Sequence, residues 1–151
     1  QLYPEKSLMV DKLIPIVQEE WAHFKMVVEE LKKRKLHLGN QRRDKYVVAL
    51  QNFIQKGGSP EGRFLDRLLF SALIEARSCE RFRLLSLYIS DDALKLFYHK
   101  LMISEASHYR LFIELAEYYL DKELVKIRWQ QWLNHEAEVL QTIELRGDRI
   151  H

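Results

Sequence analysis

Two copies of the pattern Glu-x-x-His place a carboxylate and an imidazole one helical turn apart in this chain of 151 residues. The first copy is Glu20 with His23, and the second is Glu105 with His108. Residues three apart lie on one face of an α-helix, so both side chains of a pair can reach a common point. Carboxylates and imidazoles bind transition metals. Each pair is therefore a candidate half of a metal site, with a network of structural salt bridges as the alternative.

Long helices would have to position these pairs. Apolar residues recur at helical spacing, and the predicted helices cover about residues 8–36, 44–56, 61–89, 93–120 and 122–145. Pro15 is expected to kink the first helix or to mark its start. Glycines at 39 and 57–58 break the chain. Because no strand-like alternation of useful length occurs, the sequence predicts an all-α antiparallel bundle that forms a single domain over residues 1–151.

A third candidate ligand follows from the turn near Asp91. The helices before and after this turn are expected to be antiparallel neighbours, so facing residues lie at similar distances from it. The second Glu-x-x-His pair is centred about fifteen residues beyond the turn, and the same count backwards reaches Glu75. Glu80 is more than one turn too close to the loop and points to another side of the helix. Glu75 is therefore the predicted ligand.

These five residues match most of a known ligand set. Ferritin-like di-iron bundles use one Glu-x-x-His pair from each of two helices and one glutamate from each of two others. Glu75 precedes Glu105 by thirty residues, so the glutamate that partners Glu20 is expected about ten residues before Gln1. Glu5 is too close to Glu20 to serve. We therefore expect a ferritin-like four-helix bundle with extra helices, N-terminally incomplete, whose first bundle helix precedes Gln1.

Composition sets broad limits on the class of protein. The formal net charge is only +2, so any nucleic-acid binding must depend on local clusters of charge. The single cysteine, Cys79, excludes an internal disulfide framework and fits a reducing compartment. No apolar run approaches the length needed to span a membrane, and we see no secretory segment. These features favour a cytoplasmic protein without a membrane partner.

Three segments resemble the MiaE family, the tRNA 2-methylthio-N6-isopentenyladenosine hydroxylases. They are Glu19–Phe24, Ala72–Phe82 and Ser104–Phe112, of which the part from Ile74 to Phe82 is the most specific. The resemblance covers most of the chain from Tyr3 to the final helix. Carried over by position, it implies five metal ligands, which are Glu20, His23, Glu75, Glu105 and His108. The glutamate on the family's first helix has no counterpart in this sequence.

The resemblance also implies an activity. The protein would be a non-haem di-iron monooxygenase that uses two iron ions, dioxygen and an electron-donor protein. Its substrate would be the modified adenosine beside the anticodon, so the tRNA anticodon loop would be a partner. Two alternatives remain: another ferritin-like protein that oxidises or stores iron, and a helical RNA-binding protein without metal.

Other residues carry weaker hypotheses. Cys79 lies one turn beyond Glu75 and would line the substrate pocket or be a small buried apolar residue. Arg77, Arg81 and Arg83 would guide the anticodon loop or pair with carboxylates such as Glu80. Trp129 and Trp132 would stack on bases or, preferably, pack in the core. A basic run would bind tRNA phosphates or simply be a solvated helix end; it comprises Lys32, Lys33, Arg34, Lys35, Arg42, Arg43 and Lys45.

Overall fold

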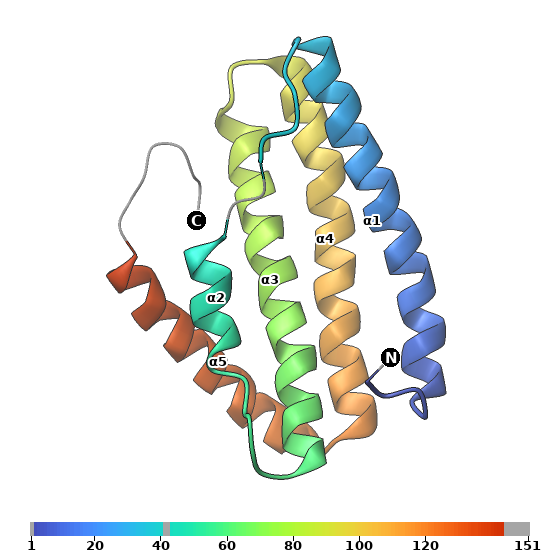
Figure 1. The fold of residues 1–151 in the computed structure, drawn as a ribbon, viewed down its shortest axis with the longest axis vertical. Helices are drawn as coiled ribbons and strands as arrows, with labels where there is room; N and C mark the ends of the chain where they lie inside the picture. The colour runs from blue at the N-terminus through green and yellow to red at the C-terminus, as the bar shows by residue number, and fades with distance from the viewer. Residues whose placement is uncertain (1, 41–42, 144–151) are drawn as a thin grey trace. The chain divides into compact units, whose positions relative to one another are not determined.

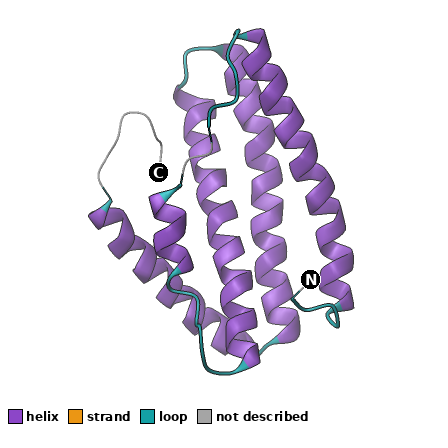
Figure 2. Cartoon of the chain, viewed as in Figure 1, coloured by secondary structure: helices purple, strands orange, loops and turns teal. Residues whose placement is uncertain are grey.

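The computed structural model describes residues 2–40 and 43–143, and these residues form helices and loops without a strand (Figures 1 and 2). The helices are α1 (Ser7–Lys33), α2 (Lys45–Gln51), α3 (Pro60–Tyr88), α4 (Asp92–Tyr119) and α5 (Lys122–Thr142). Three of them reach 27, 29 and 28 residues, as the sequence predicts. Contacts group the chain into two compact units, Gln1–Arg42 and Arg43–His151. No described helix is long and apolar enough to cross a membrane.

Side chains at the helix starts explain where four of the helices begin. Asp44, Asp91 and Asp121 each accept a hydrogen bond from a backbone N–H in the first turn of the following helix. Ser59 does the same for α3, where Pro60 occupies the first helical position. An acceptor at this position satisfies a donor that the helix itself leaves without a partner. The turn predicted at Asp91 is therefore confirmed as the cap of α4.

Two predictions about helix limits need correction. The second helix was expected over residues 44–56 but ends at Gln51, because Phe53 and Ile54 donate to Leu50 and Gln51 in tighter turns. The next backbone N–H, that of Gln55, donates to the Asp66 carboxylate on α3 and so does not continue the helix. Pro15 does not mark the start of α1, which begins eight residues earlier and includes the proline.

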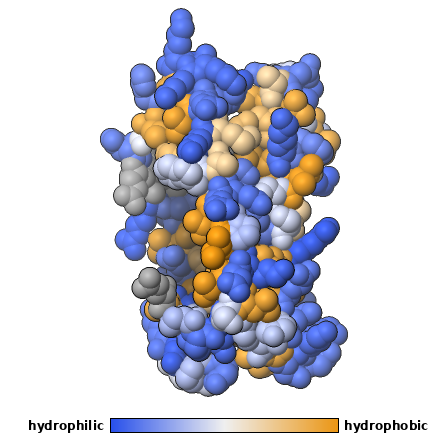
Figure 3. Space-filling model, turned by 90° about the vertical axis from the view of Figure 1, so that its right-hand side faces the viewer, coloured by the Kyte–Doolittle hydropathy of each residue, from blue (hydrophilic) through white to orange (hydrophobic). Residues whose placement is uncertain are grey.

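The first unit consists mainly of α1, which carries apolar side chains on more than one side. Met9 and Ile16 are buried, whereas an apolar stripe with alternating spacings of four and three residues is exposed. This stripe contains Val10, Ile14, Val17, Trp21 and Phe24, whose exposure ranges from 41% to 67%. Such spacing is typical of a seam between helices. Figure 3 shows that apolar side chains reach the surface on the face that it draws.

The second unit is built around the antiparallel pair α3 and α4, which the short turn at residues 89–91 connects (Figure 1). α3 packs against α4, α5 and α2, and α5 also contacts α2 and α4. The core contains aliphatic side chains and one fully buried indole, that of Trp132. The prediction that Trp132 packs in the core is thus confirmed. α3 therefore packs against α4 and also against α5 and α2.

Candidate metal centre

The α3–α4 pair brings together three of the predicted ligands. Glu105 and His108 lie on α4 and are buried, and Glu75 lies on α3 and is partly exposed. His108 Nδ1 lies 3.8 Å from Glu75 Oε2. One ligand atom from each of the three residues lies within 4.8 Å of the others. The position found for Glu75 by counting from the turn at Asp91 is therefore confirmed, whereas metal binding stays a prediction.

The chemistry of these three groups suits a metal ion. Two carboxylates and an imidazole are a typical donor set for iron, zinc or manganese. Glu105 is only 6% exposed and His108 only 2% exposed. Burying a carboxylate is costly unless hydrogen bonds or an opposite charge compensate it. A cation held between Glu75, Glu105 and His108 would supply that compensation. The three residues therefore fit the group that the sequence predicts.

Neighbouring side chains refine this picture. Ser104 lies one turn before His108 on α4. Its hydroxyl oxygen is 3.5 Å from the Nε2 atom of the His108 imidazole. Burial, followed by the Glu105 carboxylate, raises the pKa of the Cys79 thiol. A raised pKa keeps the thiol protonated at neutral pH, and a protonated thiol is a poor nucleophile and metal ligand. Burial and the nearby Glu105 carboxylate therefore disfavour the thiolate form of Cys79.

The other Glu-x-x-His pair lies on α1, in the first unit. His23 Nδ1 lies 3.3 Å from Glu20 Oε1, so the two side chains share one face of α1 as the spacing predicts. The Glu20 side chain is 47% exposed and that of His23 is 17% exposed. The pair thus has the local geometry of a half-site. Its union with the α3–α4 residues stays a prediction.

The remaining candidates divide between structural roles and untested ones. Arg77 pairs with Glu80 and Glu136, so the alternative of structural pairing is supported for this arginine. Glu80 is more than half exposed, which agrees with its rejection as a ligand. Trp129 lies against Tyr109, with ring centroids 6.0 Å apart.

The basic run has mixed surroundings. Lys32 and Lys33 lie in the last turn of α1, where cations are favoured by the helix dipole. Lys33 and Arg34 both pair with Glu30. Lys35, which has a positive φ of 56°, Arg43 and Lys45 are exposed. Arg42 lies outside the described residues. The structural alternative is therefore supported for part of the run, and the role in tRNA binding stays a prediction.

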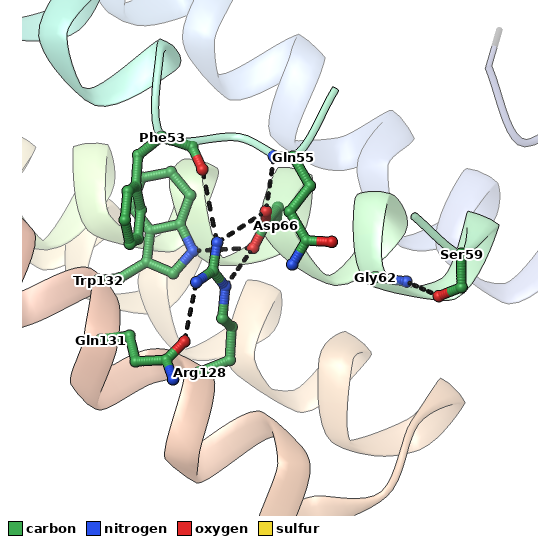
Figure 4. Close-up of polar contacts among 8 residues, drawn as sticks. All are labelled: Phe53, Gln55, Ser59, Gly62, Asp66, Arg128, Gln131 and Trp132. Atoms are coloured by element: carbon green, nitrogen blue, oxygen red, sulfur yellow. Dashed lines mark hydrogen bonds and ion pairs between the residues drawn. The ribbon is translucent and has the colours of Figure 1, made fainter. Parts of the chain in front are cut away.

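Sequence reasoning missed two buried polar clusters in the second unit. The first surrounds Asp66, which accepts hydrogen bonds from Arg128, Trp132 and the backbone of Gln55 (Figure 4). The second joins Tyr46, Arg77 and Glu136. One signal was available for the first cluster. Asp66 interrupts an apolar run on α3, and a charge at such a position needs a buried partner.

The all-helical architecture and the convergence of carboxylates with histidine define a ferritin-like protein with a candidate metal centre. The chain belongs to the MiaE family. The family model described as tRNA-(MS[2]IO[6]A)-hydroxylase (MiaE) matches residues 1–151.

Two curated relatives agree with this membership, and a solved structure agrees with the fold. The tRNA 2-(methylsulfanyl)-N(6)-isopentenyladenosine(37) hydroxylase of Pseudomonas putida is 32% identical over 114 residues, which are 76% of this chain and 54% of the relative. The Salmonella typhimurium protein of the same name is 31% identical over 109 residues, 72% of this chain and 39% of the relative. The solved structure of "Protein 43 with aldehyde deformylating oxygenase activity from Synechococcus" is also similar. It has a TM-score of 0.82 and 35% identity, covering 89% of this chain and 66% of that one.

The chain thus spans 54% of the length of the first of these curated relatives and 39% of the second.

Proposed function

We propose that this chain is part of a di-iron monooxygenase that hydroxylates the isopentenyl group of 2-methylthio-N6-isopentenyladenosine in tRNA. One observation carries the proposal. In a member of the MiaE family, Glu75, Glu105 and His108 converge between α3 and α4, with one ligand atom of each within 4.8 Å of the others. The two curated relatives, both named as hydroxylases of this nucleoside, support the substrate.

The proposed ligand set joins both Glu-x-x-His pairs. Glu75, Glu105 and His108 would hold one side of the centre, and Glu20 with His23 would complete the other. The internal repetition of the pattern supports this union, because each pair offers one carboxylate and one imidazole on one helical face.

Bound iron would supply the activation of dioxygen, for which an electron-donor protein is needed. The residues of the chain have simpler tasks. Glu105 and His108 are buried, so they would hold their ligand atoms in place and keep bulk water from the site. The Ser104 hydroxyl would fix the orientation of the His108 ring. Cys79, a protonated thiol beside Glu105, would offer a small apolar wall to the isopentenyl group.

The tRNA itself would be held by charge. Lys32, Lys35 and Lys45 are exposed, and such side chains bind phosphates without reading sequence. The basic run would therefore contribute affinity for the anticodon stem and loop, while the metal centre selects the modified base. An enzyme that acts on such a substrate would work in the cytoplasm.

The metal part of the proposal is tested by anaerobic titration of the full-length protein with ferrous iron. We expect two iron ions per chain. The Glu105→Gln and His23→Ala variants, which alter opposite halves of the centre, should each bind fewer. Less than about one iron per unsubstituted chain would overturn the di-iron assignment. Glu138→Gln is the control, because this glutamate lies on α5 and its side chain is 79% exposed.

The substrate is tested separately in cells. Mass analysis of tRNA nucleosides should show that the hydroxylated nucleoside disappears when the gene is deleted and returns with the unsubstituted gene. The Glu105→Gln gene should fail to restore it. Persistence of the hydroxylated nucleoside in the deletion strain would show that another enzyme makes it.

A second candidate function has one specific observation in its favour. The structural relative from Synechococcus, named for aldehyde deformylating oxygenase activity, is 35% identical to this chain. The second candidate is therefore an oxygenase that removes the formyl group of an aldehyde. Incubating the iron-loaded full-length protein with a long-chain aldehyde, a reductant and dioxygen separates the two functions, since only this candidate predicts that formate and a hydrocarbon form.

A further inference from the structure

A buried polar cluster of Tyr46, Arg77 and Glu136 joins α2, α3 and α5. Arg77 donates from Nε and Nη2 to Glu136 Oε1, at 2.9 and 2.8 Å. The Tyr46 hydroxyl donates to the same oxygen at 2.5 Å. Tyr46 is 2% exposed and Glu136 is 5% exposed, so water hardly competes for these bonds. One carboxylate oxygen on α5 therefore fixes side chains from two other helices.

The position of Arg77 connects this cluster with the candidate metal centre. Arg77 lies two residues after Glu75 on α3, which is a rotation of about 200° around the helix axis. The two side chains consequently leave opposite faces of α3. Glu75 points toward His108 on α4, and Arg77 points toward Glu136 on α5. The cluster thus holds the back of α3 at the level where its front carries a ligand.

Small rotations of α3 would matter at this level. A carboxylate lies about 6 Å from the helix axis, so a rotation of about 10° moves it by about 1 Å. Metal–ligand distances tolerate only about 0.2 Å. Apolar packing alone resists such a rotation of α3 less than a charged pair with directional hydrogen bonds does. A fixed partner for Arg77 therefore limits the movement to which a ligand at residue 75 is most sensitive.

A second cluster provides an internal comparison. Asp66 and Arg128 also join α3 to α5, through contacts of 2.7 and 3.0 Å. Asp66 lies eleven residues before Arg77, about three helical turns, and so shares its face of α3. It lies nine residues from Glu75, about 13 Å along the axis. Both clusters stabilise the packing of α3 on α5, but only the Arg77 cluster lies at the height of the ligand.

We propose that Tyr46, Arg77 and Glu136 are positioning residues, which set the rotation of α3 and thereby the place of the Glu75 carboxylate in the metal centre. This inference rests on the metal site proposed above. It differs from a purely structural role, because it assigns the cluster an effect on metal binding beyond its effect on stability.

The test is anaerobic titration of the full-length protein with Co²⁺, followed by the visible absorption of the bound ion, together with thermal unfolding of the metal-free protein. Glu136→Gln keeps the shape of the side chain and removes its charge. We expect it to weaken Co²⁺ binding about tenfold, the lower end of the range for groups that orient ligands, and to alter the absorption bands. Tyr46→Phe loses one hydrogen bond. It should weaken Co²⁺ binding and alter the absorption bands in the same direction as Glu136→Gln, but by less.

Arg128→Lys is the matched control, because it weakens the other cluster between the same two helices. It should lower the melting temperature while leaving Co²⁺ affinity and the spectrum unchanged. The inference is overturned if Glu136→Gln and Tyr46→Phe bind Co²⁺ like the unsubstituted protein. An equal loss of affinity in Arg128→Lys would also overturn it, since stability alone would then explain the effect. Absence of Co²⁺ binding by the unsubstituted protein would instead overturn the metal site itself, and this inference with it.

Discussion

Replacing Asp66 with alanine should cost a large part of the stability of the second unit. Asp66 is fully buried and accepts bonds from the Arg128 guanidinium at 2.7 and 3.0 Å, Trp132 Nε1 at 3.2 Å and the Gln55 N–H at 2.8 Å (Figure 4). Removing one partner of a buried ion pair costs about 3–5 kcal/mol. Arg128 keeps a bond to Gln131, which reduces the loss, whereas two neutral donors lose their acceptor. We therefore expect about 4 kcal/mol.

Urea unfolding of the metal-free protein, monitored by circular dichroism, measures this free energy. The dependence of the unfolding free energy on urea concentration should be the same in the variant and the unsubstituted protein if the folded and unfolded states keep their compactness. The Arg128→Ala variant has no guanidinium to leave unpaired. Asp66→Ala should therefore cost at least about 2 kcal/mol less in the Arg128→Ala background than in the unsubstituted protein. A cost below about 1 kcal/mol for Asp66→Ala, or additive costs for the two substitutions, would refute the role assigned to this ion pair.

Three further predictions concern other sites. Burial and the hydrogen bond to Glu136 raise the pKa of Tyr46 well above 10, so its contribution to stability is complete below pH 10 and is lost as the pH rises further. Above pH 10, the free energy of unfolding of the unsubstituted protein should therefore fall by up to about 1.4 kcal/mol more per pH unit than that of Tyr46→Phe. Unfolding free energies with the same pH dependence in both proteins would contradict this. Asp91→Ala removes the cap of α4, where Oδ1 accepts from the Leu94 N–H at 3.0 Å, and should cost about 1 kcal/mol in urea unfolding. Cys79→Ser should leave the stoichiometry of ferrous iron unchanged in anaerobic titration, because a protonated thiol is not a ligand; loss of iron would show that it is one.

The features that the sequence could predict are those governed by local rules. The α3–α4 pair has a short turn with a capping aspartate at 91, so counting residues from the turn was enough to place Glu75 opposite His108. The same kind of counting explains why Glu80 was rejected. By contrast, the end of α2 was misjudged, because the backbone N–H of Gln55 turns to Asp66, a partner that helical periodicity does not reveal.

The buried clusters could not be predicted for a related reason. Tyr46 and Glu136 are separated by ninety residues, and Asp66 and Arg128 by sixty-two. Each of these residues could equally well lie on a solvated helix face, since charged residues at helical spacing usually do. Only the packing of α5 and α2 against α3 decides that they are buried together. Counting from a turn fixes the height of a ligand along its helix, but the rotation of that helix depends on partners from distant segments. Glu75 illustrates both conditions, because its height follows from the turn at Asp91 and its direction from what holds the opposite face of α3.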